Sequence, residues 1–336
     1  MFSLSGVCRN QALKPTPPVD IIPGFKFNGD MHTLPGKLVQ DLTAAAHGKI
    51  KVREPLAPYT SYRIGGPTPV MLFPDSETEI ADILNIVHTA DQPLQVIGKG
   101  SNLLISDHGW EGVTLYLGDN LSGWWFENDH AYAMAGTTLL DFVKACCEKG
   151  LAGLEKLAGI PGAVGGALKM NAGAFGQEIG AVTASVHGCY PDGSPFIAQG
   201  PEIGFGYRRA PALEDIILTR GCFKLLPAKE EALEKEMADT LAQRTAKQPL
   251  SCPSCGSVFK RPEGHYAGAL IEKAGLKGRK LGGAMVSPKH AGFIINTGTA
   301  TAADIYALIN LIEKTVKDKF GVELKREVKV IGRFDS

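Results

Sequence analysis

The stretch Gly159-Ile160-Pro161-Gly162-Ala163-Val164-Gly165-Gly166 decides the fold class, together with the earlier loop Gly98-Lys99-Gly100-Ser101-Asn102. Both loops follow apolar residues, and successive glycines let backbone N–H groups point into one concavity that can hold an anion. The first loop is no Rossmann fingerprint, because the third glycine of that motif would fall at Leu103. Neither loop ends in the Gly-Lys-Ser/Thr of a Walker A loop. Close packing of backbone explains any one of these glycines equally well, but two such loops favour a dinucleotide held by its pyrophosphate.

The composition is that of a globular protein, with 44% hydrophobic and 21% charged residues. The apolar runs are too short to span a bilayer. Thirty-five basic residues balance thirty-five acidic ones, which excludes a general attraction to nucleic acid or anionic lipid. The seven cysteines, an odd number, favour a reducing compartment, and we therefore expect a cytoplasmic protein without a membrane segment.

Periodicity predicts a mixed α and β chain. Helices are expected around the stripe Ile80–Val87, around Leu139–Cys146, over 228–248 as a linker helix, and over Thr301–Phe320. Strands are expected at Val70–Phe73, Leu94–Ile97, Thr183–Tyr190 and 322–331. Residues 1–30 are Pro-rich and are predicted to form a poorly ordered extension.

Three motifs carry a resemblance to a known family. They are Thr60-Ser61-Tyr62-Arg63-Ile64-Gly65-Gly66, Gly98 to Leu104, and Gly159 to Gly166. In this order they resemble the FAD-binding half of the UDP-N-acetylenolpyruvoylglucosamine reductases (the MurB family), over about residues 31–334. The resemblance implies an α+β chain with the FAD-binding fold of the vanillyl-alcohol-oxidase-like (PCMH-type) flavoproteins in two lobes, residues 31–225. An α/β substrate-binding domain, residues 226–336, would follow, and the diphosphate of the substrate would lie between the two domains.

The same resemblance implies a set of cofactor contacts around a non-covalently bound FAD, with NADPH as the reductant. The residues expected at the FAD are Arg63, Gly65, Gly98, Lys99, Gly100, Ser101, Asn102, Leu103, Gly159, Gly162, Gly165, Gly166, Asn171 and Gly173.

The catalytic residues implied by the resemblance are Arg208, Ser257 and Glu327. Arg208 matches the arginine that polarises the substrate carboxylate, Ser257 the serine that protonates the enolic carbon, and Glu327 the glutamate that completes the site. Local patterns alone read them otherwise: Ser257 after a glycine is a turn residue, and Glu327 lies on the solvated face of a strand. Arg208 beside Arg209 is a surface pair.

Two features depart from the usual pattern of the family. Lys260-Arg261-Pro262 stands where many members have Lys-Asn-Pro, so Lys260 and Arg261 are both candidates for substrate contact. The stretch from Arg209 to Ile216 leaves little room for the extra loop that carries a tyrosine in part of the family, which favours the class without it.

The expected partner is a UDP-sugar, with no nucleic acid or membrane, and the protein is expected to be a monomer that acts in peptidoglycan precursor synthesis. Cys252-Pro253-Ser254-Cys255 has no second cysteine pair, so no metal is expected. The alternatives are another FAD-dependent oxidase or dehydrogenase of the same fold and a non-catalytic flavin-binding module.

Overall fold

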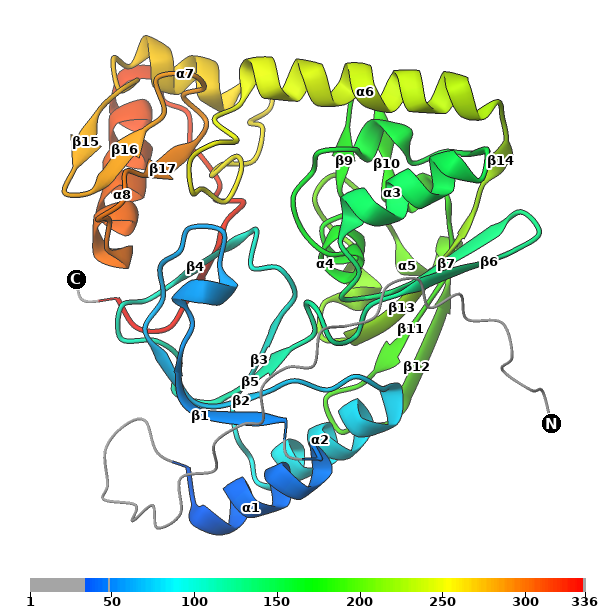
Figure 1. Cartoon of the computed structure of the whole chain (residues 1–336). Helices are drawn as coiled ribbons and strands as arrows, with labels where there is room; N and C mark the ends of the chain where they lie inside the picture. The colour runs from blue at the N-terminus through cyan, green and yellow to red at the C-terminus, as the bar shows by residue number, and fades with distance from the viewer. Residues whose placement is uncertain (1–33, 48, 335–336) are drawn as a thin grey trace. The chain divides into compact units, whose positions relative to one another are not determined.

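A computed structural model describes residues 34–47 and 49–334 of the chain (Figure 1). The expected extension over residues 1–30 lies outside the described residues. The chain forms two compact units. The first contains the described residues up to Arg53 together with Pro69–Lys99 and Gly112–Leu241, and the second contains Glu54–Thr68, Gly100–Glu111 and the described residues from Ala242 onward.

The first unit contains a five-stranded antiparallel sheet in the order β12-β11-β13-β7-β6. The helices α3 and α4 pack on it, with the rings of Phe142 and Phe223 5.3 Å apart. Leu139, Phe142, Val143 and Cys146, the stripe that predicted α3, are all buried, so this helix is confirmed. The bounds are β12 Pro195–Gln199, β11 Thr183–Cys189, β13 Ile217–Lys224, β7 His130–Met134, β6 Trp124–Glu127, α3 Leu139–Glu148 and α4 Val164–Lys169.

A four-stranded sheet in the order β1-β2-β5-β3 precedes it along the chain, with β5 parallel to both β2 and β3. The helices α1 and α2 lie side by side near it (Figure 1). The predicted stripe of α2 is fully buried, so that helix is confirmed as well. The bounds are β1 Ile50–Pro55, β2 Pro67–Leu72, β5 Val113–Tyr116, β3 Leu94–Ile97, α1 Gly36–Ala45 and α2 Glu77–Thr89.

In the second unit, α8 packs against a small antiparallel sheet, β15-β16-β17, and α7 packs against α8. Thr301 and Asp304 form a capping box at the start of α8, and Gly321 ends the helix with φ +69°, so the helix expected over Thr301–Phe320 is confirmed. A separate parallel pair joins β4 to β18. The bounds are β15 Lys280–Leu281, β16 Ala284–Val286, β17 Ile294–Asn296, α7 Ala267–Lys273, α8 Ala302–Phe320, β4 Leu103–Ile105 and β18 Lys329–Ile331.

The predicted helix over 228–248 is confirmed as α6 Glu230–Lys247. Several short elements complete the fold. The remaining elements are β8 Leu151–Ala152, β9 Gly173–Ala174, β10 Gln177–Glu178, β14 Leu226–Pro227, α5 Gly200–Ile203, and the 3-10 turns η1 Ala57–Tyr59, η2 Glu155–Leu157, η3 Ile179–Ala181 and η4 Pro211–Leu213.

The expected strand over 322–331 is wrong for most of its length, because only Lys329–Ile331 is a strand. Arg326, the exception to the alternation, turns toward α8. Its guanidinium donates to both carboxylate oxygens of Glu313 at 2.7 Å and lies 4.9 Å from the centre of the Tyr306 ring. The backbone of Arg326 forms an isolated bridge with Phe259, so this part of the segment pairs at one point with another extended segment instead of forming a continuous strand.

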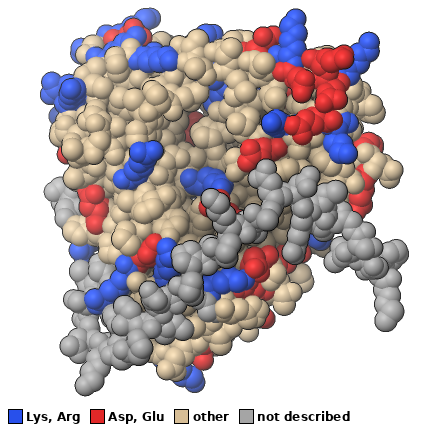
Figure 2. Space-filling model, viewed as in Figure 1, with Lys and Arg blue, Asp and Glu red and all other residues tan. Residues whose placement is uncertain are grey.

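The surface carries both signs of charge. Figure 2 shows basic and acidic side chains interspersed on the face drawn, in keeping with a formal net charge of zero. None of the helices over residues 34–47 and 49–334 combines the length and the hydropathy that a membrane-spanning segment requires.

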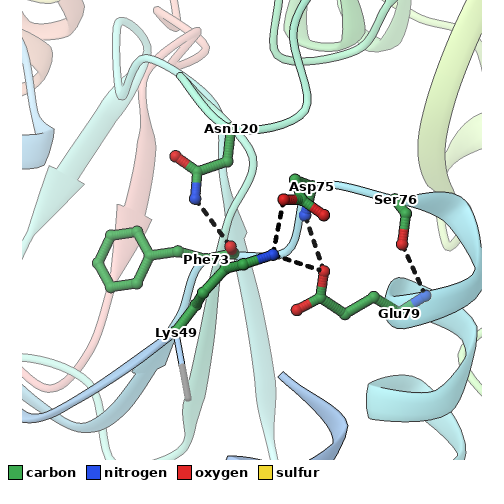
Figure 3. Close-up of polar contacts among 6 residues, drawn as sticks. All are labelled: Lys49, Phe73, Asp75, Ser76, Glu79 and Asn120. Carbon is green, nitrogen blue, oxygen red and sulfur yellow. Dashed lines mark hydrogen bonds and ion pairs between the residues drawn. The ribbon is translucent and has the colours of Figure 1, made fainter. Parts of the chain in front are cut away.

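A buried carboxylate fixes the start of α2 (Figure 3). Glu79 is 2% exposed, and its Oε2 accepts from the backbone N–H of Asp75 at 2.9 Å and from Lys49 Nζ at 3.4 Å. Lys49 also contacts Asp75 at 2.6 Å, and Ser76 caps the helix by accepting the N–H of Glu79. The hydrogen bond from Lys49 is the main cause that holds the pKa of Asp75 below its ordinary value. Burial lowers the pKa of Lys49, but its contacts with Asp75 and Glu79 outweigh burial and raise it.

We expect Lys49→Met to lower the free energy of unfolding by about 1–2 kcal/mol at pH 7, because it leaves a buried carboxylate without its cation. The lowered pKa of Asp75 stabilises the fold above the ordinary carboxyl pKa, and this contribution is lost as the pH falls through the lowered value. Urea denaturation should therefore show the difference at pH 7 and show it shrinking below about pH 4.

The control is Lys144→Met, which removes an exposed pair with Glu148 and should change stability by less than about 0.5 kcal/mol. Equal effects of the two substitutions at pH 7 would contradict the role given to Lys49.

Candidate functional site

The two glycine loops meet within the first unit. Gly98 follows β3 directly, and a Cβ atom at this position would lie 3.3 Å from the Cβ of Ala163 in the second loop. The backbone N–H groups of Gly98 and Lys99 have no acceptor within the described residues. The start of the first loop therefore lies against the second loop, with donors that a phosphate could accept.

The second loop uses its glycines in different ways. Gly159 and Gly162 have φ of +78° and +132°, a region that favours glycine. A Cβ at Gly165 would lie 2.8 Å from the Cβ of Ala135, so close packing explains that residue. Gly166 is exposed, and a Cβ there would meet nothing within 4 Å. Gly166 is thus the glycine of this loop that leaves a free surface at the start of α4.

Asn171 and Gly173, which follow this loop and are predicted to contact FAD, are engaged by other groups of the protein. A Cβ at Gly173 would lie 2.7 Å from Cγ of Glu178, so the close approach of β9 and β10 explains this glycine. Asn171 is 1% exposed, and its side chain is hydrogen bonded to three protein groups. That these two residues contact FAD stays a prediction.

Lys99 is held by Asp119, an acidic residue outside the predicted site. Its ammonium forms an ion pair with Asp119, which also accepts from the hydroxyl of Tyr116 at 2.9 Å. Burial raises the pKa of Asp119, but the hydrogen bonds from Lys99 and Tyr116 outweigh burial and lower it. A carboxylate three residues after the end of a strand is a weak signal, and only the folded chain shows its partner.

The rest of the first loop belongs to the second unit. Gly100 has φ +58°, and a Cβ there would lie 2.1 Å from the carbonyl oxygen of Tyr59, so this position requires glycine. Its carbonyl accepts the N–H of Ser61 at 3.1 Å. This contact brings Gly100 next to the segment that carries Arg63 and Gly65. Arg63 is exposed and has φ +57°, and Gly65 has φ +148°.

The loop then joins the residues around Glu327. Asn102 Nδ2 donates to the carbonyl of Glu327 at 3.1 Å, and the N–H of Lys329 donates to the carbonyl of Asn102 at 2.9 Å. Leu103 pairs with Lys329 at the start of the parallel pair β4–β18. A predicted cofactor loop and a predicted catalytic residue are therefore hydrogen bonded within one unit.

Backbone hydrogen bonds join the segment that contains Ser257 to the segment that contains Glu327. The carbonyl of Val258 accepts the N–H of Glu327 at 2.7 Å, and the N–H of Lys260 donates to Lys325 at 2.8 Å. Ser257 itself forms a bridge with Phe293 and is exposed, whereas Glu327 is half-buried. Two of the three predicted catalytic residues thus stand on adjoining extended segments.

Arg208 belongs to the first unit, in the turn Gly206–Arg209. It is half-buried and has φ +55°, whereas Arg209 is exposed. The two neighbouring arginines therefore differ in exposure, which the local sequence pattern alone did not indicate.

The two candidate substrate residues differ in their surroundings. Arg261 is exposed, and its guanidinium lies 4.1 Å from the centre of the Tyr266 ring, a cation–π contact. Lys260 is half-buried, next to the backbone bridge that joins Phe259 to Arg326.

Comparison with known proteins identifies the family. A model of the C-terminal domain of UDP-N-acetylenolpyruvoylglucosamine reductase matches residues 248–331, and a model of an FAD-binding domain matches residues 68–195. The UDP-N-acetylenolpyruvoylglucosamine reductase of Listeria monocytogenes serotype 4a is 43% identical over 291 residues, which are 86% of this chain and 97% of the relative. The chain belongs to the UDP-N-acetylenolpyruvoylglucosamine reductase family.

Other members agree with this assignment. The reductase of Syntrophomonas wolfei is 41% identical over 84% of this chain and 95% of its own length. The crystal structure of the reductase (MurB) from Thermus caldophilus has a TM-score of 0.70 at 33% identity and covers 84% of this chain and 98% of its own. The predicted fold, an FAD-binding domain of the PCMH type followed by the C-terminal domain of this family, is confirmed.

The residues present fit the FAD that the family requires. An FAD pyrophosphate needs N–H donors and close backbone approach. The N–H groups of Gly98 and Lys99, which have no acceptor among residues 34–47 and 49–334, and the open surface at Gly166 meet these needs. Asn102 would hold the loop in place through its bond to the carbonyl of Glu327.

The cysteine pair near Ser257 is a structural feature of this site. Cys255 is buried, and its thiol donates to the carbonyl of Leu103 at 3.1 Å. Burial raises the pKa of the Cys255 thiol to about 12. Among the described residues, no group of three or more His, Cys, Asp or Glu side chains is placed to hold a metal ion.

We expect iodoacetamide at pH 8 to modify Cys252 in the folded protein and to leave Cys255 unmodified, because alkylation needs the thiolate and access to solvent. Peptide mass spectrometry after a time course measures both rates. In urea both residues should react alike, and equal rates in the folded protein would contradict the buried position of Cys255.

Proposed function

We propose that this chain reduces the enolpyruvyl group of UDP-N-acetylglucosamine enolpyruvate to give UDP-N-acetylmuramate, a step of peptidoglycan precursor synthesis. Membership of the reductase family makes it an FAD-dependent oxidoreductase that uses NADPH. The chemistry that bound FAD supplies is hydride transfer from NADPH to the enolpyruvyl double bond.

The observation that carries this proposal is the contact between the segments of Ser257 and Glu327. Both lie in the region matched by the C-terminal domain of the family, and the 2.7 Å bond from the N–H of Glu327 to Val258 fixes their spacing. A non-catalytic flavin-binding module would not need these two polar residues on adjoining segments.

The proposed roles follow from where charge builds during the reaction. Hydride addition at the terminal carbon leaves negative charge on the carbon that bears the carboxylate. The guanidinium of Arg208 would stabilise this charge, and Ser257 Oγ–H would donate the proton to that carbon. A serine hydroxyl is a weak acid, so this step depends on a strongly basic carbanion and a fixed geometry. Glu327 completes the group.

Substrate binding is assigned to Lys260 and Arg261. The UDP-sugar carries a diphosphate, which a lysine or arginine can neutralise. Arg261 replaces the asparagine of many members, and its contact with the exposed Tyr266 holds the guanidinium in a defined orientation.

The proposed class within the family, the one without the tyrosine loop, rests on the short connection between Arg209 and β13. Between Arg209 and β13 the chain has only the turn η4 Pro211–Leu213, which supports the class without the tyrosine loop. We also propose that the FAD-binding domain spans 31–225 and the substrate domain 226–336, and that the protein is a cytoplasmic monomer.

We expect Ser257→Ala to bind FAD and to be bleached by NADPH at the normal rate, because the serine acts only on the substrate. Reoxidation of the reduced flavin by the enolpyruvyl substrate should slow by about 10²–10⁴-fold, the usual effect of losing a general acid. Stopped-flow absorbance of the flavin separates the two half-reactions.

Ser254→Ala, a substitution three residues earlier in the same turn region, is the matched control and should leave both half-reactions unchanged. Normal reoxidation of Ser257→Ala would exclude Ser257 as the proton donor, and a purified chain that takes up no FAD would exclude the whole proposal.

A further inference from the structure

Asn171 is a buried amide whose polar atoms are all engaged by the protein. Its Nδ2 donates to Glu178 Oε2 at 2.8 Å and to the carbonyl of Gly206 at 3.1 Å. Its Oδ1 accepts the N–H of Gly180 at 3.0 Å. The residue is 1% exposed and has φ +41°, a conformation that asparagine tolerates better than other side chains. Both hydrogens of the amide are therefore used within the chain.

The carbonyl of Gly206 is the anchor of the turn that carries Arg208. Gly206 N–H donates to Arg209 at 3.0 Å, and Arg209 N–H returns a bond to Gly206 at 3.1 Å. Arg208 has φ +55°, which is unfavourable for a residue with a Cβ. A strained conformation persists only where the surroundings enforce it, and Asn171 supplies one such contact from outside the turn.

The residue before the turn packs at the same place. A Cβ at Gly180 would lie 2.6 Å from the Phe205 ring and 2.7 Å from Asn171 Oδ1. Only glycine at position 180 lets the ring and the amide lie together. The turn is thus fixed at its carbonyl and at the ring that precedes it.

The chain neighbour of Glu178 is hydrogen bonded to residues that precede the second glycine loop. Gln177, next to Glu178 in β10, donates to Glu155 Oε1 at 3.0 Å and accepts the N–H of Lys156 at 2.9 Å. The other oxygen of Glu155, which is 7% exposed, accepts the N–H of Gly153 at 2.7 Å. Asn171 is therefore attached to the segment that leads into the second glycine loop.

We propose that Asn171 is a positioning residue for Arg208: its amide fixes the Gly206 carbonyl and so sets where the guanidinium stands. The inference rests on the proposed function of Arg208. It assigns Asn171 to the reaction with substrate and not to FAD, because an amide with both hydrogens engaged would have to release a protein partner to donate to a ligand.

The first test is Asn171→Gly, which allows the positive φ and removes the side chain with its amide. We expect reoxidation by substrate to slow by about 10–100-fold, as for a misplaced catalytic group. Bleaching by NADPH and the Kd for FAD should stay within about twofold of the wild type. The control is Asn128→Gly, another asparagine of positive φ (+56°), exposed in the β6–β7 turn, which should change neither. Weaker FAD binding with normal reoxidation would overturn the inference.

A double-mutant cycle with Arg208→Lys separates positioning from a general loss of structure. If Asn171 acts through Arg208, the double variant should be about as slow as Arg208→Lys alone, instead of showing the product of the two effects. Multiplying effects would overturn the inference while leaving the role of Arg208 intact. A normal rate for Arg208→Lys would overturn both.

Should Asn171→Gly fail to fold, Glu178→Ala loosens the same amide without touching the strained backbone. It should slow reoxidation and show the same dependence on Arg208, and a normal reoxidation rate in this variant would count against the inference.

Discussion

The parallel pairing of β4 with β18 is the contact on which the second unit depends. It joins residues about 225 positions apart in the chain, and the hydrogen bonds of Asn102 with Glu327 and Lys329 lie at its edge. Without this pairing, the end of the first glycine loop and the segment of Glu327 would not be held next to each other. The segment of Ser257 is joined to them because the Val258 carbonyl accepts the N–H of Glu327. The pairing thus assembles a predicted cofactor loop and two predicted catalytic residues from three distant stretches.

Glycine serves different physical purposes within the site, although the sequence shows only one kind of loop. At Gly100 and Gly165 the backbone approaches other atoms too closely for a side chain. At Gly166 the missing side chain leaves open space instead. The first kind builds the fold, and only the second offers a surface to a flat ligand. Both loops lie within the residues that match an FAD-binding domain, but the individual roles of the glycines depend on contacts that form only in the folded chain.

The helices α2, α3 and α8 could be predicted because their apolar residues repeat with the helical period, and Ser76 and Thr301 also cap the starts of α2 and α8. The strand expected over 322–331 could not be corrected from sequence, since the attraction of Arg326 to Glu313 on α8 is a tertiary contact. The candidate catalytic residues came from family motifs and not from local pattern. Asp119 had only a weak sequence signal, because its partner Lys99 lies in a different loop. The hydrogen bonds of Asn171 had none, because one of its partners is the backbone carbonyl of Gly206, 35 residues along the chain.

The order in which the ribosome makes the chain determines when the β4–β18 pair can form. During synthesis the N-terminal partner, Leu103–Ile105, leaves the ribosome long before Lys329–Ile331, so β4 must wait unpaired while most of the protein is translated. Closing so long a loop is also entropically slow, which places this pairing among the late steps of folding. The nascent chain is therefore exposed to wrong strand pairing at β4, and a ribosome that stalls before residue 329 would release a chain whose first unit is complete and whose second unit is not.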